Sequence, residues 1–411
     1  MKKLKLIFAA AMIIFLAACT KDSVKFESQY KVEIPVDVNK TKAVYSENAI
    51  TVADAETATW ELWSFNNEEY LKIHDAKYGE TDYTLQPWID NPTEMIALGI
   101  SPVSISPDEG YPAKGSYKVD ADNHSIIATA AVTEKRDGEP NNPSDKVNYY
   151  APMPVAFYGI YDAEEASIEK DGAKIYTLAW TNNKKAQYIV AAFTPTFTVG
   201  DANGKIEVRT QNGKIEKETR DRYPFTIQYI YVGTPTKVVY EKGYNYTPEG
   251  EGMMKIGLPK GGIFAGDKLG TVGAHNDYLF DTFETNVSTA ATLLPNKSDE
   301  VNVYLCCWNC GTRGFISENS DGSNTVIKPG MYFYLGGKLV VDANSKVSNE
   351  TNPDCPTTPT GVFMPDVKTI ATINITTLRN AMNDVDPKPG FRTTFEADVK
   401  YGDMNVTYVE N

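Results

Sequence analysis

The sequence predicts a mainly β protein. Short runs rich in β-branched and aromatic residues alternate with turn residues about every 8 to 15 positions, a spacing typical of β-sandwiches. The chain has 25 tyrosines and 29 glycines, and no long apolar stripe with the 3.6-residue period of a helix. Its 411 residues are enough for two domains that each bury a core.

The chain begins with a signal peptide, residues 1–18. Three lysines precede an apolar run, Leu6 to Ala18, that is shorter than the roughly 20 residues needed to span a bilayer. The run ends in Leu16-Ala17-Ala18-Cys19, which matches a bacterial lipobox. We therefore expect Cys19 to be acylated and to tether the chain to a membrane. The alternative is an ordinary secretory signal with an incidental cysteine.

A removable strand is expected directly after the tether. Apolar and polar residues alternate from Tyr30 to Val38, the period of a strand with one buried face. A polar stretch with Lys40 and Lys42 follows, and it resembles a protease site. Cleavage after Lys42 would make Ala43 the mature N-terminus. Residues 19–42 are thus expected to be an acylated propeptide.

Two sandwich domains are expected after this propeptide, an N-terminal one over residues 43–182 and a C-terminal one over residues 183–411. Residues Tyr244 to Gly273 are expected to form a Gly-rich loop, and Thr376 to Asn383 a short helix. The expected strands share β-type composition and turn-bounded ends. They include residues 50–52, 59–65, 125–132, 174–180, 186–199, 225–232, 237–240, 302–308, 331–341, 370–375, 393–401 and 404–409.

Composition excludes several functional classes. The chain has 54 acidic and 40 basic residues, a formal net charge of −14, so it lacks the basic footprint of a nucleic-acid-binding protein. Only three histidines occur, and the sequence contains no HExxH, GxSxG or Walker A motif. We expect no catalytic residue, no bound cofactor and no metal, and hence a protein that is not an enzyme.

The cysteines near Trp308 offer three interpretations. Cys306, Cys307 and Cys310 lie close together, and Cys355 is alone further on. Zinc sites of the finger type need two spaced pairs or histidines, which this arrangement lacks. Cys307 shares a strand face with Val303 and Leu305, which favours a core position. A disulfide is permitted outside the cytoplasm, and the most favoured pair is Cys310 with Cys355.

The five tryptophans could instead form a sugar-stacking platform. They are Trp60, Trp63, Trp88, Trp180 and Trp308. Trp63 and Trp180 lie within strand-like runs, where a core position is the simpler interpretation. A glycan-binding surface lipoprotein therefore remains an alternative without a supporting motif.

The C-terminal third resembles a known family. Residues 328–339 (KPGMYFYLGGKL), 361–369 (GVFMPDVKT) and 372–381 (TINITTLRNA) are similar to the corresponding segments of Bacteroidales fimbrillins, the subunits of type V pili. The resemblance implies two tandem sandwich domains of transthyretin-like or Greek-key type. It rests on soft β-sheet patterns, and residues 43–199 match the family only in size and class.

The resemblance implies a role for each end of the chain. In that family a lipoprotein precursor reaches the outer membrane, and a trypsin-like or arginine-specific protease then removes the acylated leader with its first strand. A C-terminal strand of another subunit fills the vacated groove. No arginine precedes Arg136 here, so a lysine-accepting protease is required. The implied donor residues alternate along the C-terminus: Phe395, Ala397, Val399, Tyr401, Met404, Val406 and Tyr408.

Together these features predict a stalk subunit of a cell-surface fimbria. Its partners would be copies of itself, joined head to tail, together with accessory anchor and tip subunits, the processing protease and the outer membrane through the precursor's lipid. A fimbrial tip adhesin is the nearest alternative. For residues 395–401 a further alternative is that they form the last hairpin of the C-terminal domain.

Overall fold

The computed structural model describes a chain made of strands. The described residues are 28–32, 58–66, 70–76, 93–101, 114–131, 149–170, 173–180, 186–199, 208–209, 215–216, 225–257, 263–268, 278–283, 291–309, 315–318, 324–328, 330–342, 344–349, 352, 354–375 and 391–403. Every helix-or-strand element among them is a strand. The mainly β, sandwich-type fold is thereby confirmed.

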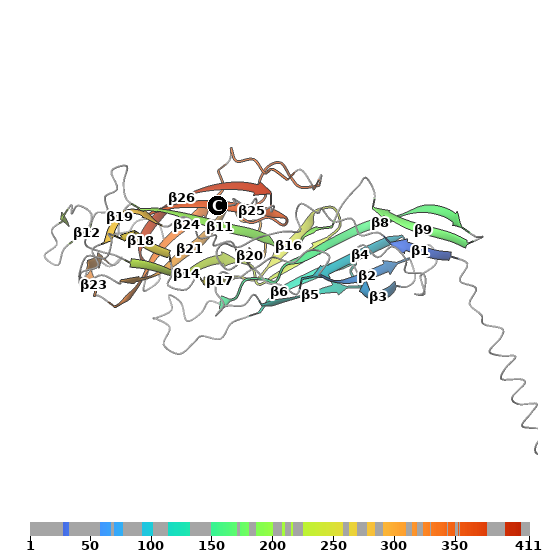
Figure 1. Cartoon of the computed structure of the whole chain (residues 1–411), viewed down its shortest axis with the longest axis horizontal. Helices are drawn as coiled ribbons and strands as arrows, with labels where there is room; N and C mark the ends of the chain where they lie inside the picture. Colours follow the sequence, from blue (N-terminus) through green and yellow to red (C-terminus); the bar gives the residue numbers. More distant parts are fainter. Residues whose placement is uncertain are drawn as a thin grey trace, which may run out of the picture.

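The first ten strands lie towards one end of the elongated molecule, except for β7, which joins the eleven-stranded sheet (Figure 1). These strands are β1 (Ser28–Val32), β2 (Thr59–Phe65), β3 (Tyr70–Ala76), β4 (Glu94–Ile100), β5 (Gly115–Asp120), β6 (Ser125–Ala130), β7 (Tyr149–Tyr150), β8 (Ala156–Lys170), β9 (Ala173–Trp180) and β10 (Gln187–Tyr188). Seven of them form a sheet in the order β1-β9-β8-β4-β2-β3, with β10 on β8.

The remaining strands supply the other end and the middle. They are β11 (Ala191–Val199), β12 (Val208–Arg209), β13 (Ile215–Glu216), β14 (Phe225–Thr234), β15 (Lys237–Glu241), β16 (Asn245–Glu249), β17 (Gly252–Gly257), β18 (Ile263–Lys268), β19 (Tyr278–Phe283), β20 (Ala291–Leu293), β21 (Glu300–Asn309), β22 (Phe315–Glu318), β23 (Asn324–Ile327), β24 (Tyr332–Val340), β25 (Val367–Ile375) and β26 (Phe391–Asp403). An eleven-stranded sheet runs β19-β18-β14-β21-β24-β26-β25-β11-β20, with β17 and β7 off its main path.

A four-stranded sheet, β16-β15-β6-β5, forms the second layer over the seven-stranded one. Two ring contacts join the layers: Tyr158 to Tyr240, with centroids 5.1 Å apart, and Phe65 to His124, at 4.3 Å. This layer combines strands from both sides of residue 183. The division into domains at that residue remains a prediction.

The burial pattern of strand β2 shows why it forms one layer of a sandwich. Trp60, Leu62 and Ser64 point into the protein and are fully buried, while Glu61 and Trp63 between them are half-buried. Strand β4 is buried along its central five residues, as expected for a strand covered on both faces. Burying each large apolar side chain contributes roughly 1.5 to 3 kcal/mol.

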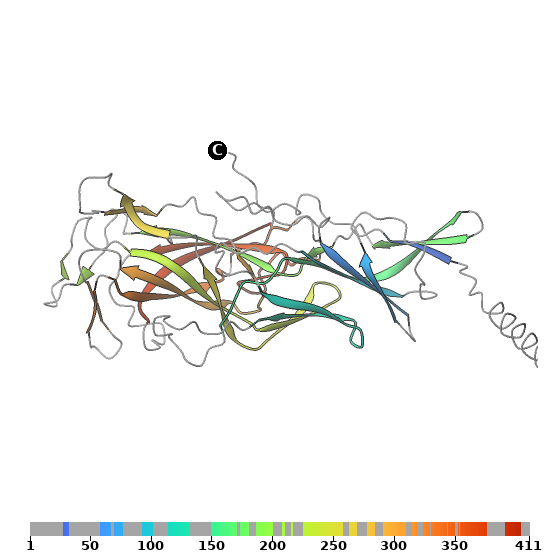
Figure 2. The ribbon, with the colours of Figure 1, turned by 60° about the horizontal axis from the view of Figure 1, so that its bottom comes forward.

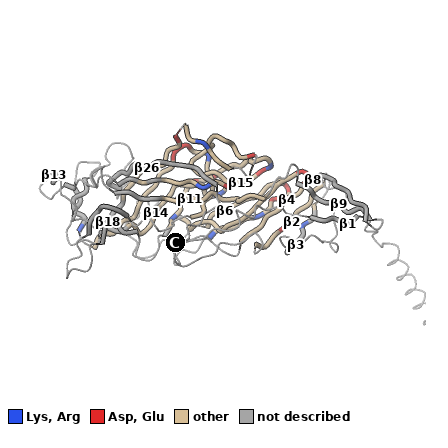
Figure 3. Tube along the Cα trace, turned by 45° about the horizontal axis from the view of Figure 1, so that its top comes forward, with Lys and Arg blue, Asp and Glu red and all other residues tan. Residues whose placement is uncertain are grey.

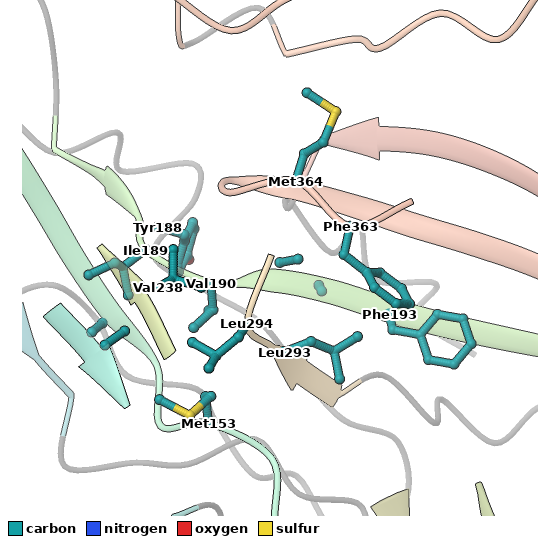
Figure 4. Close-up of a cluster of buried hydrophobic side chains, with 14 of the residues drawn as sticks. Met153, Tyr188, Ile189, Val190, Phe193, Val238, Leu293, Leu294, Phe363 and Met364 are labelled. Carbon is teal, nitrogen blue, oxygen red and sulfur yellow. The ribbon is translucent and has the colours of Figure 1, made fainter. Parts of the chain in front are cut away.

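One buried cluster connects the two ends of the molecule. It includes Trp60 and Ile96 from the seven-stranded sheet, and Leu305 and Ile373 from the eleven-stranded sheet. Figure 4 shows its middle, where Ile189 and Val190 lie near Leu294 and Val238. The large hydrophobic surfaces of both ends therefore share a single core.

The expected Gly-rich loop from Tyr244 to Gly273 is wrong. Strands β16 and β17 and strand β18 occupy most of this stretch. Glycines mark the tight turns here: Gly243, just before the stretch, and Gly250 within it have φ of 75° and 72°, in the left-handed region that glycine adopts at no steric cost. Turns this close together leave strands of five or six residues, too short to show a clear alternation.

The strand expected over residues 186–199 is interrupted by a bend at Ile189 and Val190, so that it divides into β10 and β11. The helix expected from Thr376 to Asn383 lies outside the described residues. Among the described residues, none forms a helix with the length and hydrophobicity that crossing a bilayer requires.

Candidate assembly site

Strand β1, which lies within the predicted leader, pairs at the edge of the seven-stranded sheet. Strand β1 runs parallel to β9, with Ser28 opposite Lys174 and Val32 opposite Leu178. It is the terminal strand of the described sheet, so β9 is its single described neighbour. Ile34, Val36 and Val38, and the predicted processing residues Lys40, Lys42 and Ala43, lie outside the described residues, as does Cys19.

Strand β8 explains how this edge projects from the molecule. Its first half, Ala156 to Asp162, pairs with β4, whereas its second half, Ala163 to Lys170, pairs with β9. The β8–β9 hairpin therefore extends past the β2–β4 ladder, and β1 lies on that extension at one end of the molecule (Figure 2). Without β1, the outer backbone groups of β9 would have no described partner.

Four of the seven implied donor residues lie inside the chain's own sheet. Phe395, Ala397, Val399 and Tyr401 belong to β26, which pairs antiparallel with β25 and parallel with β24. A strand held on both sides must break two ladders before it can leave. Met404, Val406 and Tyr408 follow β26 directly and lie outside the described residues. The donor role of all seven residues remains a prediction.

Cys307 and Cys355 lie in different environments. Cys307 is fully buried and faces the core, as predicted. Burial raises the pKa of its thiol well above the usual value, which keeps it protonated and unreactive. The Cys355 thiol donates to the Tyr244 hydroxyl at 3.5 Å. A Cys310–Cys355 disulfide would replace that bond, but Cys310 lies outside the described residues, so the bridge remains a prediction.

The described residues offer neither a metal site nor an exposed Trp60 ring for a sugar. Among the described residues, no group of three or more His, Cys, Asp or Glu side chains is placed to hold a metal ion. Charged residues of both signs are interspersed along the described chain (Figure 3). Trp60 is fully buried and stacks on Phe157 at 5.9 Å. It therefore serves the core and presents no surface to a ligand.

Trp63 is half-buried at the rim of the core. The Lys72 ammonium lies 5.1 Å from the centre of its ring, and the ring nitrogen lies 3.4 Å from Glu61. Lys72 and Glu61 also form an ion pair at 2.7 Å. The ring face and its polar group are thus engaged within the protein. Trp88 lies outside the described residues, as do the side chain of Trp180 and its contacts.

Comparison with known proteins gives structural neighbours of one kind. No protein-family model and no curated protein matches the chain. A "putative cell adhesion protein" from Bacteroides eggerthii shares 8% identity, with 92% of this chain and 95% of that chain covered at a TM-score of 0.39. One from Parabacteroides distasonis shares 8% identity, with 92% and 99% covered at 0.35.

A third neighbour is the tip fimbrial protein Mfa3 from Porphyromonas gingivalis, with a C-terminal truncation. It shares 11% identity, with 92% of this chain and 99% of that chain covered at a TM-score of 0.30. These neighbours are thus described as adhesion and fimbrial proteins of Bacteroidales.

Proposed function

We propose that this chain is a structural subunit of a cell-surface fimbria, exported as a lipoprotein precursor and polymerised by donor-strand exchange. The observation that carries the proposal is the position of β1: a strand near the predicted acylated N-terminus, paired along a sheet edge with β9. A strand at an edge can be removed without breaking the rest of its sheet. The signal peptide, the lipobox and the fimbrillin-like segments support the same role.

Proteolysis would convert this edge into an assembly site. Loss of β1 leaves the outer N–H and C=O groups of β9 unpaired, and such an edge strongly favours addition of another strand. The incoming strand would be the C-terminal tail of a second copy. Because β26 is held on both sides, we place the donor in the residues after it, which include Met404, Val406 and Tyr408. Anchor and tip subunits and a lysine-accepting protease complete the assembly on the outer membrane.

Processing is the first prediction. Changing Lys40 and Lys42 together to Gln should leave an acylated, unpolymerised precursor on the membrane, because the leader strand stays attached. N-terminal mass spectrometry of cells producing the unmodified chain or the variant measures cleavage of the leader. Ala43 is the expected mature N-terminus of the unmodified chain. Changing Lys31 to Gln, a lysine inside β1, is the matched control and should leave processing intact. Filaments of normal length from the double variant would refute the proposal.

A further inference from the structure

A long hairpin joins the two ends of the molecule. Strands β14 and β17 pair in the eleven-stranded sheet up to Thr234 opposite Gly252. The same two chain segments then continue as β15 and β16, with Lys237 opposite Glu249. There β15 pairs with β6, placing Tyr240 opposite Ile126. The base of the hairpin thus lies in one sheet, and its outer part, residues 237–249, completes the second layer of the other. We call residues 237–249 the junction hairpin.

Three buried tyrosines of the junction hairpin donate hydrogen bonds to backbone carbonyls outside the hairpin. The Tyr240 hydroxyl donates to the carbonyl of Ile189 at 2.5 Å. Tyr244 donates to Pro365 at 2.7 Å and Tyr246 to Asn296 at 2.9 Å. All three side chains are buried, and burial raises the pKa of Tyr246 to about 12. These hydroxyls therefore remain protonated donors at neutral pH.

The same buried face of the hairpin also packs on the N-terminal sheet. Tyr240 contacts the ring of Tyr158 in β8, and Val238 is fully buried in the shared core (Figure 4). At the tip, Lys242 forms ion pairs with Asp162 of β8 and, at 3.7 Å, with Glu94 of β4. The hairpin is thus held by apolar packing, hydrogen bonds and charge to both ends of the molecule.

We propose that the junction hairpin is a clasp that makes the two ends of the molecule one cooperative unit. Without it the seven-stranded sheet would lose half of its covering layer, and the backbone carbonyls of Ile189, Asn296 and Pro365 would lose buried donors. Opening at either end therefore requires opening at both. This inference concerns the folded chain alone and does not depend on processing or on polymerisation.

The test uses the full mature chain and hydrogen exchange in each end. Tyr240→Phe/Tyr246→Phe removes two hydroxyls and no packing, and Val238→Ala removes packing from the same hairpin. Exchange should become about five- to tenfold faster in β2 and β4 and, by the same factor, in β21 and β24. Tyr70→Phe is the matched control, because Tyr70 is 50% exposed on the edge strand β3. It should change neither end.

The exchange rates at the two ends distinguish a clasp from a hairpin that stabilises one end only. Equal acceleration at both ends, with a single unfolding transition in urea, supports the clasp. Acceleration confined to one end, or two separate transitions, overturns it. So does unchanged exchange at both ends in the hydroxyl double variant and in Val238→Ala. If Val238→Ala fails to fold, the hydroxyl double variant decides alone.

Discussion

At the scale of single residues, two strand glycines differ sharply in what surrounds them. A Cβ on Gly99 would lie 2.6 Å from the Trp60 ring, and Trp60 is fully buried. The nearest atom to a Cβ on Gly233 is the carbonyl oxygen of Asn302 at 3.4 Å, an ordinary contact. The tryptophan at the centre of the sandwich therefore depends on a glycine opposite it in the next strand, since Trp60 pairs with Gly99.

We predict that Gly99→Ala lowers the free energy of unfolding by about 1 to 3 kcal/mol, because the ring must move within a packed core. Gly233→Ala should change it by no more than about 1 kcal/mol, since glycine in a strand interior is itself weakly unfavourable. Urea denaturation of the two variants beside the unmodified chain measures both. Equal losses in the two variants would contradict this assignment of the cost.

The sequence predicts the role of a residue only where that residue belongs to a local pattern, such as an alternating strand face. Cys307 shares an alternating strand face with Val303 and Leu305, and all three are buried as that pattern indicates. The anchoring tyrosines of the junction hairpin were not predictable. Their partners are backbone carbonyls at least 50 residues away in the sequence. No local sequence pattern indicates contacts over such separations. A cluster of three tyrosines around Gly243 was the signal available.

At the scale of elements, alternation predicted long strands and missed short ones. Strand β2 matches its expected bounds. Strands β21 and β26 extend beyond theirs by one or two residues at each end, whereas β24 is one residue shorter at each end. Strand β4 shows no alternation because it is buried on both faces, so this pattern does not predict it. Strands β16 to β18 replace the expected Gly-rich loop, because closely spaced glycines limit each strand to five or six residues. The pairing of β1 with β9 is a long-range contact that no local pattern encodes.

The register of β1 gives an element-scale prediction. Lys31 is paired with Thr177, and paired Cα atoms on neighbouring strands lie about 5 Å apart, within the range that a disulfide bridges. A precursor with Lys31→Cys/Thr177→Cys should therefore form a crosslink under oxidation and retain its leader after proteolysis, so that no polymer forms until a reductant is added. Non-reducing gels report the retained leader.

A control pair tests the register itself. In Lys31→Cys/Ala179→Cys the second position is two residues further along β9, so its Cα lies at about 8 Å, too far for an unstrained disulfide. This pair should crosslink poorly and polymerise without reductant. Equal crosslinking of both pairs would show that β1 does not hold the described register.

At the scale of the whole molecule, the sequence predicts the sandwiches but not the path of the junction hairpin between two sheets. Turn chemistry and strand spacing predict sandwiches, and the structure contains them. They cannot reveal that residues 237–249 leave one sheet to complete another, because that depends on tertiary pairing of β15 with β6. A boundary drawn at residue 183 would cut the N-terminal sandwich from two of the four strands of its second layer.

The last prediction concerns the tail that follows β26. Deleting residues 404–411 removes Met404, Val406 and Tyr408 but leaves β26, which ends at Asp403, paired with β24 and β25. The truncated subunit should therefore fold, be exported and be cleaved at the normal site. It should not extend a filament, because it offers no donor strand. Added to intact subunits, it should shorten their filaments by accepting a donor and ending the chain.

A longer deletion separates this loss from a loss of folding. Removing residues 391–411 takes β26 out of the middle of the eleven-stranded sheet, so β24 and β25 both lose a neighbour and the chain should fail to fold. Electron microscopy of producing cells measures filament length, and resistance of the exported protein to proteolysis measures folding. If the 404–411 deletion gives filaments of full length, the tail is not the donor, and the edge left by β1 must be filled by another strand.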